Sequence, residues 1–320
     1  MSDVQPKKAE PSVEDLFLLP VSTWLPKGRS RKGEVGIEIE VEGRNLIHEN
    51  LDKYWSYHEE GSLRGEHAEY VLTNPIRRDR VRDALEYLSA SLNRAELVEG
   101  SPNTSVHVHI NVQDMSVKQM YTFACAYLIF EDLLVEYCGP KRVGNLFCLR
   151  AKDAEFLVKD MVQHVRDVKR YLVVYGDGVR YSSMNLCALA KFGSIEFRAM
   201  RGVNANADLI CPWVDTLLSI KDTSKMFANP RELVQAFSRF NTDAFVRNFL
   251  PRETARWVLA KEDYSARLFE GMRLMQDVAY ASDWTVLVPS TASSRSAQLR
   301  PAFAPQMQNI VIMDDEDEEF

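Results

Sequence analysis

Three segments of the chain alternate apolar and polar residues, the pattern of a β-strand with one buried face. They are residues 35–42 (VGIEIEVE), 106–112 (VHVHINV) and 194–198 (SIEFR). Their polar sides carry titratable side chains: Glu38, Glu40 and Glu42 on the first, His107 and His109 on the second, and Glu196 and Arg198 on the third. Carboxylates two residues apart on a strand lie roughly 7 Å apart and repel each other, so we expect a positive group among them. A divalent cation is the leading candidate, and a solvated acidic edge strand is the alternative.

Apolar residues recur with a helical period in seven further segments. These segments are 79–93, 116–137, 153–170, 207–222, 230–240, 252–261 and 263–281. Another short strand is expected at 69–72, just before Asn74 and Pro75. Helices and strands interspersed in this way predict an α+β fold, with a mainly antiparallel sheet, helices packed on one face and a site on the other.

Composition divides the chain into three parts. Residues 1–32 are rich in proline and form an N-terminal arm, 33–285 hold the folded domain, and 286–320 form a flexible tail that ends in an acidic run. We expect this acidic tail to be either disordered or the binding segment for a protein partner. The end of the arm carries a basic cluster that is either a solvated loop or a contact with an anionic substrate: Lys27, Arg29, Arg31 and Lys32.

Charge and cysteine content narrow the class of protein. The formal net charge is -7, but residues 314–319 supply six of the negative charges, so the body is nearly neutral and gives no sign of nucleic-acid binding.

No apolar run approaches the roughly 20 residues that span a bilayer, and the N-terminus lacks the apolar core of a secretion signal. The five cysteines show no CxxC spacing. We therefore expect a cytoplasmic protein with reduced thiols and no membrane association.

The types of the polar residues indicate which metal they would hold. Two histidines on one strand suit zinc, but carboxylates dominate this set and favour magnesium or manganese. An arginine beside a metal-binding carboxylate, such as Arg198 beside Glu196, is well placed to hold a transferring phosphoryl group. The chain has neither GxxxxGK[ST] nor GxGxxG, so metal, Arg and His would have to hold any nucleotide. Satisfied polar side chains and a surface ion pair are the alternatives.

Five short motifs, taken in order, resemble the amidoligase family within the glutamine-synthetase-like carboxylate–amine (COOH-NH2) ligases. They are residues 36–40 (GIEIE), 60–63 (EGSL) followed by Glu69, 105–109 (SVHVH), 181–186 (YSSMNL) and 193–198 (GSIEFR). The resemblance covers about residues 33–225 and implies a glutamine-synthetase-like catalytic domain with a curved antiparallel sheet. It also implies a reaction in which ATP converts a carboxylate to an acyl phosphate. An amine then displaces phosphate and leaves an amide or isopeptide bond.

The resemblance assigns roles to individual residues. ATP and two or three Mg2+ (or Mn2+) ions would bind here, with Glu38 and Glu40 on different ions. Glu69 and Glu196 would be further metal ligands. His107 would bind a metal ion or the ATP phosphates, and His109 would bind the nucleotide. Arg198 would stabilise the γ-phosphoryl group during its transfer. Arg142 and Asn145 would contact substrate or phosphate, with a helix-capping loop as the alternative. The substrates would be a small-molecule or peptide carboxylate and an amine.

The chain departs from the family pattern in places. Glu60 stands where an Asp is more usual, and the arm is too short for the small N-terminal domain of glutamine synthetase. Glu42 and Glu66 are additional acids, either of which could replace a named ligand. Two other functions stay open: a metal-dependent hydrolase that uses the same Glu/His face without ATP, and a non-catalytic scaffold that binds partners through its arm and tail.

Overall fold

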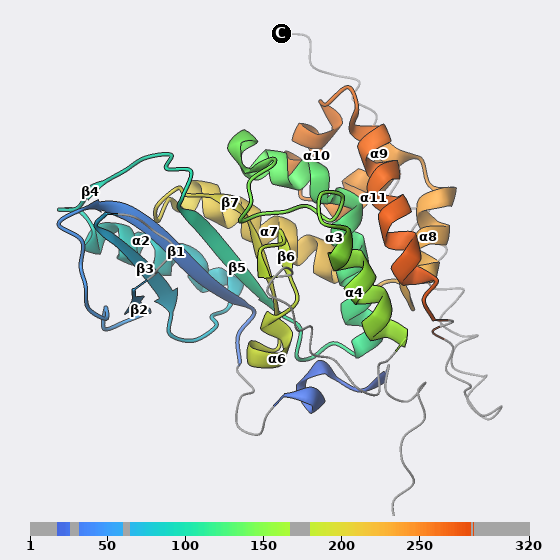
Figure 1. Ribbon diagram of the computed structural model, residues 1–320, viewed down its shortest axis with the longest axis horizontal. Helices are drawn as coiled ribbons and strands as arrows, with labels where there is room; N and C mark the ends of the chain where they lie inside the picture. Colours follow the sequence, from blue (N-terminus) through green and yellow to red (C-terminus); the bar gives the residue numbers. More distant parts are fainter. Residues whose placement is uncertain (1–17, 26–31, 60–64, 167–179, 283, 285–320) are drawn as a thin grey trace, which may run out of the picture. The chain divides into compact units, whose positions relative to one another are not determined.

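The first predicted strand forms β1 (Val35–Arg44), which lies inside an open sheet in the computed structural model of the protein (Figure 1). Its alternate residues Val35, Ile37, Ile39 and Val41 are buried, as the period-two pattern predicts. Strands pair with β1 along both of its edges. The structure describes residues 18–25, 32–59, 65–166, 180–282 and 284.

Seven strands make up this sheet in the described residues. The other six are β2 (Trp55–His58), β3 (His67–Leu72), β4 (Glu96–Leu97), β5 (Ser105–Asn111), β6 (Met184–Asn185) and β7 (Ser194–Arg201). Their order is β2-β3-β1-β5-β7-β6, and β4 pairs with the end of β1. Every pair of these strands is antiparallel, so the expected antiparallel sheet of an α+β fold is confirmed.

A helix is present in each of the seven predicted segments, and the described ends lie within a few residues of the expected ones; residues 167–170, the expected end of the third segment, lie outside the described part of the chain. The helices are α2 (Val81–Ser91), α3 (Val117–Cys138), α4 (Glu155–Arg166), α7 (Ala207–Ser224), α8 (Pro230–Arg239), α10 (Arg252–Leu259) and α11 (Tyr264–Ala279). The sequence patterns missed α6 (Ala188–Phe192) and α9 (Thr242–Phe249), and they missed the short strands β2, β4 and β6. Apart from α9, which is as long as the predicted α10, these elements are too short to display a clear period.

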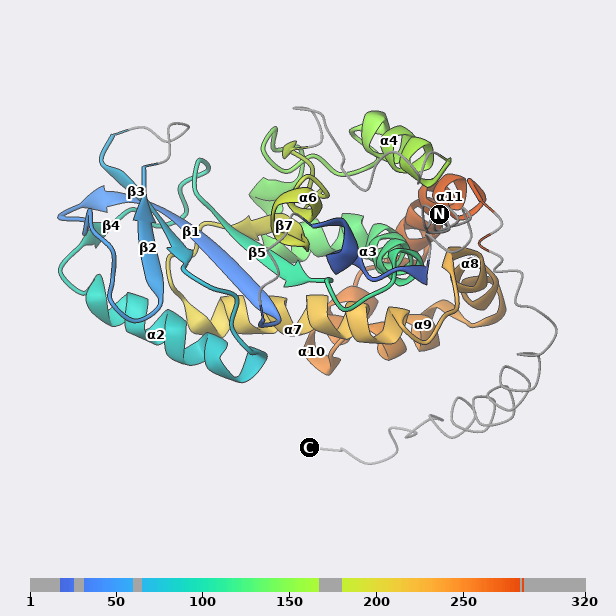
Figure 2. The ribbon, with the colours of Figure 1, turned by 90° about the horizontal axis from the view of Figure 1, so that it is seen from below.

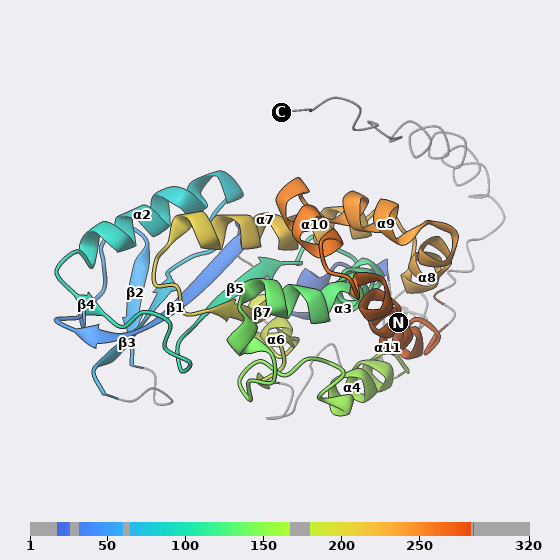
Figure 3. The same cartoon turned by 90° about the horizontal axis from the view of Figure 1, so that it is seen from above.

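One face of the sheet is covered by helices. Figure 2 shows α2 and α7 running beneath the strands, on the side of the apolar residues of β1. Helix α3 packs on the same side of β7, where the Phe197 ring centroid lies 5.7 Å from that of Phe123 and 4.7 Å from that of Tyr127. In Figure 3, α3 lies among α7, α8, α10 and α11. The polar residues of the central strands therefore lie on the opposite face.

Part of the N-terminal arm packs against the domain. The 3-10 turn η1 (Val21–Trp24) begins at Val21, which is fully buried and donates its backbone N–H to the Met115 carbonyl at 2.8 Å. Several predictions concern residues outside the described part of the chain: the turn at 60–62, the basic residues Lys27, Arg29 and Arg31, and the acidic tail. Among the described helices, none combines the length and the apolar character needed to cross a membrane.

A buried carboxyl group on α3 joins separate segments near the sheet. Glu131 accepts a hydrogen bond from the Ser183 hydroxyl at 2.5 Å and another from the Ala151 backbone N–H at 2.6 Å. Burial raises the pKa of Glu131 from its usual 4.5 to about 7, although those two hydrogen bonds oppose the rise. Folding therefore takes up a proton at this site between these two pH values.

We predict that Glu131→Gln removes a pH dependence of stability. Because the folded-state pKa is raised, the stabilisation from protonated Glu131 is complete below about pH 4.5 and is lost as the pH rises through 7. Chemical unfolding at pH 5 to 8 should show the variant gaining up to about 3 kcal/mol over the wild type as the pH rises. Equal pH profiles for the two proteins would contradict this.

Glu136→Gln on the same helix is the control. Burial would raise the pKa of Glu136, but hydrogen bonds from Lys261 and Arg267 hold it below its usual value. Glu136 is therefore ionised throughout pH 5 to 8, so its variant should lose stability by an amount that does not vary with pH.

Candidate metal centre

The register of three strands brings the predicted polar residues together. Glu38 of β1 lies opposite His107 of β5, and His109 of β5 lies opposite Glu196 of β7. On the other edge of β1, Glu40 lies opposite Glu69 of β3. Directly opposed residues on neighbouring antiparallel strands point to the same face, so the pairing collects these groups over a few ångströms.

His107 is the centre of the cluster and only 2% of its surface is exposed. Its Nδ1 lies 3.1 Å from Oε2 of Glu38 and 3.6 Å from Oε1 of Glu196. Its Nε2 lies 3.8 Å from Oε1 of Glu40. One imidazole therefore contacts acids from two strands, β1 and β7.

The Ser105 hydroxyl, whose role the sequence did not predict, holds the Nε2 side of the His107 ring. Ser105 Oγ lies 2.7 Å from Oε2 of Glu40 and 2.7 Å from Nε2 of His107. A carboxylate can only accept, so the hydroxyl donates to Glu40 and accepts a hydrogen bond from the His107 Nε2–H. By the same rule Nδ1 donates to Oε2 of Glu38 at 3.1 Å, and a metal ion bound beside Glu38 and Glu196 would take the place of this proton on the Nδ1 lone pair.

Two overlapping sets of residues could hold metal ions. One is Glu38, His107 and Glu196, and the other is Glu40, Glu69 and His107. Within each set the donor atoms lie within 4.8 Å of one another. The donors are carboxylate oxygens and one imidazole, with no thiol, which suits magnesium or manganese better than a thiophilic metal. The lone pair on Nδ1 of His107 fits the first set.

His109 and Arg198 border this cluster from opposite sides. Nε2 of His109 lies 3.2 Å from Oε1 of Glu38, and its Nδ1 lies 3.1 Å from the Ser194 hydroxyl. Nη1 of Arg198 donates to Oε1 of Glu196 at 2.6 Å. The other oxygen of Glu196 accepts a hydrogen bond at 2.8 Å from the Asn185 side chain.

These positive groups keep the buried acids ionised. Burial alone would raise the pKa of Glu38, but the charge of His109 and hydrogen bonds from His107 and His109 hold it well below its usual range. Burial would also raise the pKa of Glu196, but the charges of His109 and Arg198 lower it. For His109 the two effects are reversed. Burial would lower its pKa, but the negative charge of Glu38 raises it. The expected positive charge among the carboxylates is thus supplied by side chains of the protein.

The two additional acids take no part in either metal-binding set. Glu42 accepts a hydrogen bond from the Ser101 hydroxyl at 2.7 Å, and Glu66 accepts one from the Leu46 backbone N–H at 3.1 Å. Each carboxylate therefore holds a neighbouring loop.

Arg142 and Asn145 lie near the cluster but are engaged elsewhere. Arg142 is buried, and its Nη2 donates to the Arg198 carbonyl at 2.7 Å. The Asn145 side chain accepts from the Phe147 backbone N–H at 2.8 Å within its own loop. A direct contact of either residue with substrate or phosphate stays a prediction.

Three polar contacts of the cluster were missed from the sequence: those of Ser105, Asn185 and Ser194. Two of them continue a recognised alternation, since Ser105 precedes His107 by two residues and Ser194 precedes Glu196 by two. The strand period could have identified those two residues. Asn185 lies on the two-residue strand β6, where no period can be seen.

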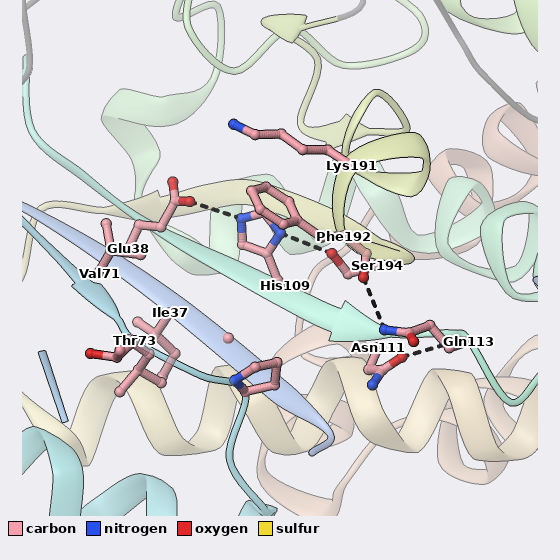
Figure 4. Close-up of a pocket in the computed structure, with 13 residues that line it drawn as sticks. Ile37, Glu38, Val71, Thr73, His109, Asn111, Gln113, Lys191, Phe192 and Ser194 are labelled. Carbon is pink, nitrogen blue, oxygen red and sulfur yellow. Dashed lines mark hydrogen bonds and ion pairs between the residues drawn. The ribbon is translucent and has the colours of Figure 1, made fainter. Parts of the chain in front are cut away.

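A pocket of about 410 Å3 opens beside Glu38 and His109 (Figure 4). Most of its wall is apolar, with Ile37 and Val71 from the strands and Phe192 from α6. Lys191 projects over the pocket in Figure 4, and polar side chains line the end of β5. A mostly apolar pocket with a few polar groups, adjoining a charged cluster, is typical of a small-molecule site.

Comparison of the sequence with protein-family models matched none of them, and comparison with curated proteins found no related sequence.

We predict that the purified protein binds Mn2+ and that Glu196→Gln weakens this binding about tenfold or more. The substitution removes a charged oxygen ligand and keeps the shape of the side chain, although its NH2 group cannot accept a hydrogen bond as both oxygens of Glu196 do. Isothermal titration calorimetry with Mn2+ measures the effect. Glu42→Gln is the matched control, because Glu42 lies on the same polar face outside both sets. Equal loss in the two variants would mean that general negative charge attracts the ion.

Proposed function

We propose that this protein is an ATP-dependent carboxylate–amine ligase, an amidoligase with a glutamine-synthetase-like fold. One observation carries the proposal. The two possible metal-binding sets share His107 on one face of the sheet, and Arg198 hydrogen-bonds Glu196 of the first set. An antiparallel sheet covered by helices on its other face agrees with the fold that the sequence resemblance implies.

The donor set agrees with chemistry on a nucleoside triphosphate. Magnesium ions, when bound by these carboxylates, would neutralise the oxygens of the phosphate chain. The buried acids are already ionised and converge on a small volume, so the protein would bind such ions with little rearrangement. Glu38 and Glu40 leave the same strand towards different sets, as expected for two ions side by side.

Arg198 supports phosphoryl transfer over metal-assisted hydrolysis. Its guanidinium donates to Glu196, a member of the first set, and lies 3.5 Å from Nδ1 of His107 through Nη1. A cation at this position would stabilise the charge that develops on the transferring phosphoryl group. Hydrolysis of an amide by a metal-bound water does not need it.

The pocket beside His109 is suited to the nucleoside part of ATP. Its apolar side chains Val71 and Phe192 offer surfaces on which a base can stack or pack. Its polar side adjoins Glu38, so a nucleoside in the pocket would direct its phosphates towards the carboxylate cluster. His109 lies between the two and would orient the phosphate chain.

The reaction then follows from these positions. The carboxylate substrate attacks the γ-phosphorus of ATP, ADP leaves, and Arg198 holds the equatorial phosphoryl oxygens in the transition state. The acyl phosphate formed is next attacked by the amine, which releases phosphate and leaves an amide. Burial of His107, Glu40 and Glu196 keeps water from much of this face and so limits hydrolysis of the acyl phosphate.

Trapping the acyl phosphate tests the proposal. Wild-type protein is incubated with Mg2+, ATP, pools of amino acids, dicarboxylic acids and glutamyl peptides, and hydroxylamine as a general amine. We expect ADP and a hydroxamate in equal amounts, and neither without Mg2+. Cleavage of amides in the absence of ATP would favour the hydrolase. Failure to bind Mg2+-ATP in calorimetry would favour the scaffold.

We predict that Arg198→Ala lowers the rate of ADP formation about 10²- to 10³-fold, as loss of a transition-state donor does. Mn2+ should still bind, because Arg198 is not a metal ligand in either set. Arg82→Ala is the control, since Arg82 lies on α2 and pairs with Asp208 on the helical side of the sheet. An unchanged rate in Arg198→Ala would exclude the role given to this side chain.

A further inference from the structure

Both backbone polar groups of Arg198 are held by residues from outside its strand. Its backbone N–H donates to the Ser183 carbonyl at 2.8 Å, and its carbonyl accepts from Nη2 of Arg142 at 2.7 Å. Ser183 directly precedes β6, which pairs with β7 only at Phe197 and Glu196. Regular pairing on that edge therefore ends just before Arg198, and these two hydrogen bonds take its place.

Arg142 is an unusual group to find in this position. Only 3% of its surface is exposed, its Nε has no hydrogen-bond partner, and no acid of the described residues forms an ion pair with it. The Cys148 thiol lies beside it, and the positive charge of Arg142 opposes the rise that burial causes in the pKa of this thiol. Burying a charge without a counter-charge costs free energy, and replacing such a group with an apolar one is often neutral or stabilising. Stability alone therefore does not account for an arginine here.

The second support of Arg198 is itself anchored to α3. The Ser183 hydroxyl donates to Glu131, whose other oxygen accepts from the Ala151 N–H. Arg142 ends the turn η3 (Pro140–Arg142), which follows α3 after Gly139. Both contacts with the Arg198 main chain thus derive from the longest helix described, which is packed firmly in the core.

We propose that Arg142 is a positioning residue, which holds the Arg198 guanidinium where the transferring phosphoryl group must pass. The inference rests on the proposed function. The far end of the Arg198 side chain has one short contact, with Glu196, and two long ones: from Nε to the Phe147 carbonyl at 3.4 Å and from Nη1 to Nδ1 of His107 at 3.5 Å. Its placement therefore also depends on where its main chain lies. A displacement of about 1 Å in such a group can cost about 10²-fold in rate.

The test compares Arg142→Met with the wild type in the hydroxylamine assay. We expect kcat for ADP formation to fall about 10- to 100-fold, with the KM for Mg2+-ATP within about twofold and the melting temperature unchanged or higher. Arg150→Met is the matched control. Arg150 lies in the same segment but pairs with Asp132 and Asp153, so its loss should lower the melting temperature and leave kcat unchanged.

A double variant separates positioning from direct contact. If Arg142 acts through Arg198, adding Arg142→Met to Arg198→Ala should cause no further loss of kcat. Losses that multiply would show that Arg142 touches the substrate itself and would overturn the proposal. A lower melting temperature with unchanged kcat in Arg142→Met would overturn it as well, since the residue would then be merely structural.

Crystal structures of the wild type and Arg142→Met give a readout that does not need activity. We expect the Arg198 guanidinium to move away from Oε1 of Glu196 in the variant, whereas an unmoved guanidinium would overturn the positioning role. A wild-type protein that forms no ADP in the assay would refute the proposed ligase function alone. The displacement of Arg198 would still be measured.

Discussion

The gathering of ionised carboxylates on one side of a sheet is the constraint on which the rest of this structure depends. Glu40 and Glu196 are buried, and Glu38 lies between them and the pocket. Such a set is stable only if positive charge is interleaved with it. His107, His109 and Arg198 supply that charge from the two neighbouring strands. The same contacts that stabilise the cluster also preorganise it, because they hold Glu38 and Glu196 ionised and in place.

Packing of the helices against the other face of the sheet stabilises the fold and offsets the free-energy cost of burying these charged groups. The apolar residues of β1, β5 and β7 pack against α2, α3 and α7, so the sheet is held rigidly from behind. Rigid support matters because the polar groups act at distances of about 3 Å, where small shifts change electrostatic interactions strongly. The buried Glu131 and Arg142 extend this support to the edge of the sheet, where strand pairing runs out beside Arg198.

Most of the fold and much of the site were predictable for a local reason. A strand with one buried face repeats every two residues and an amphipathic helix every 3.6, so β1, β5, β7 and the long helices are visible in the sequence. The short β2, β4, β6 and α6 were missed because they span too few residues to show a period. Asn185 was missed with β6. The metal-ligand roles, the nucleotide and the ligase reaction remain proposals that the geometry supports.

By itself, the sequence determined which side chains share a face on each strand: Glu38 with Glu40, His107 with His109, and Glu196 with Arg198. Only the tertiary structure decided that Glu38 lies opposite His107 and that His109 lies opposite Glu196. Register depends on contacts between residues some 70 to 90 positions apart, and no local pattern contains it. The tertiary structure likewise placed Arg142 behind Arg198. A loop residue's side chain is directed by the surfaces it packs between, and those surfaces exist only once the helices and strands have come together.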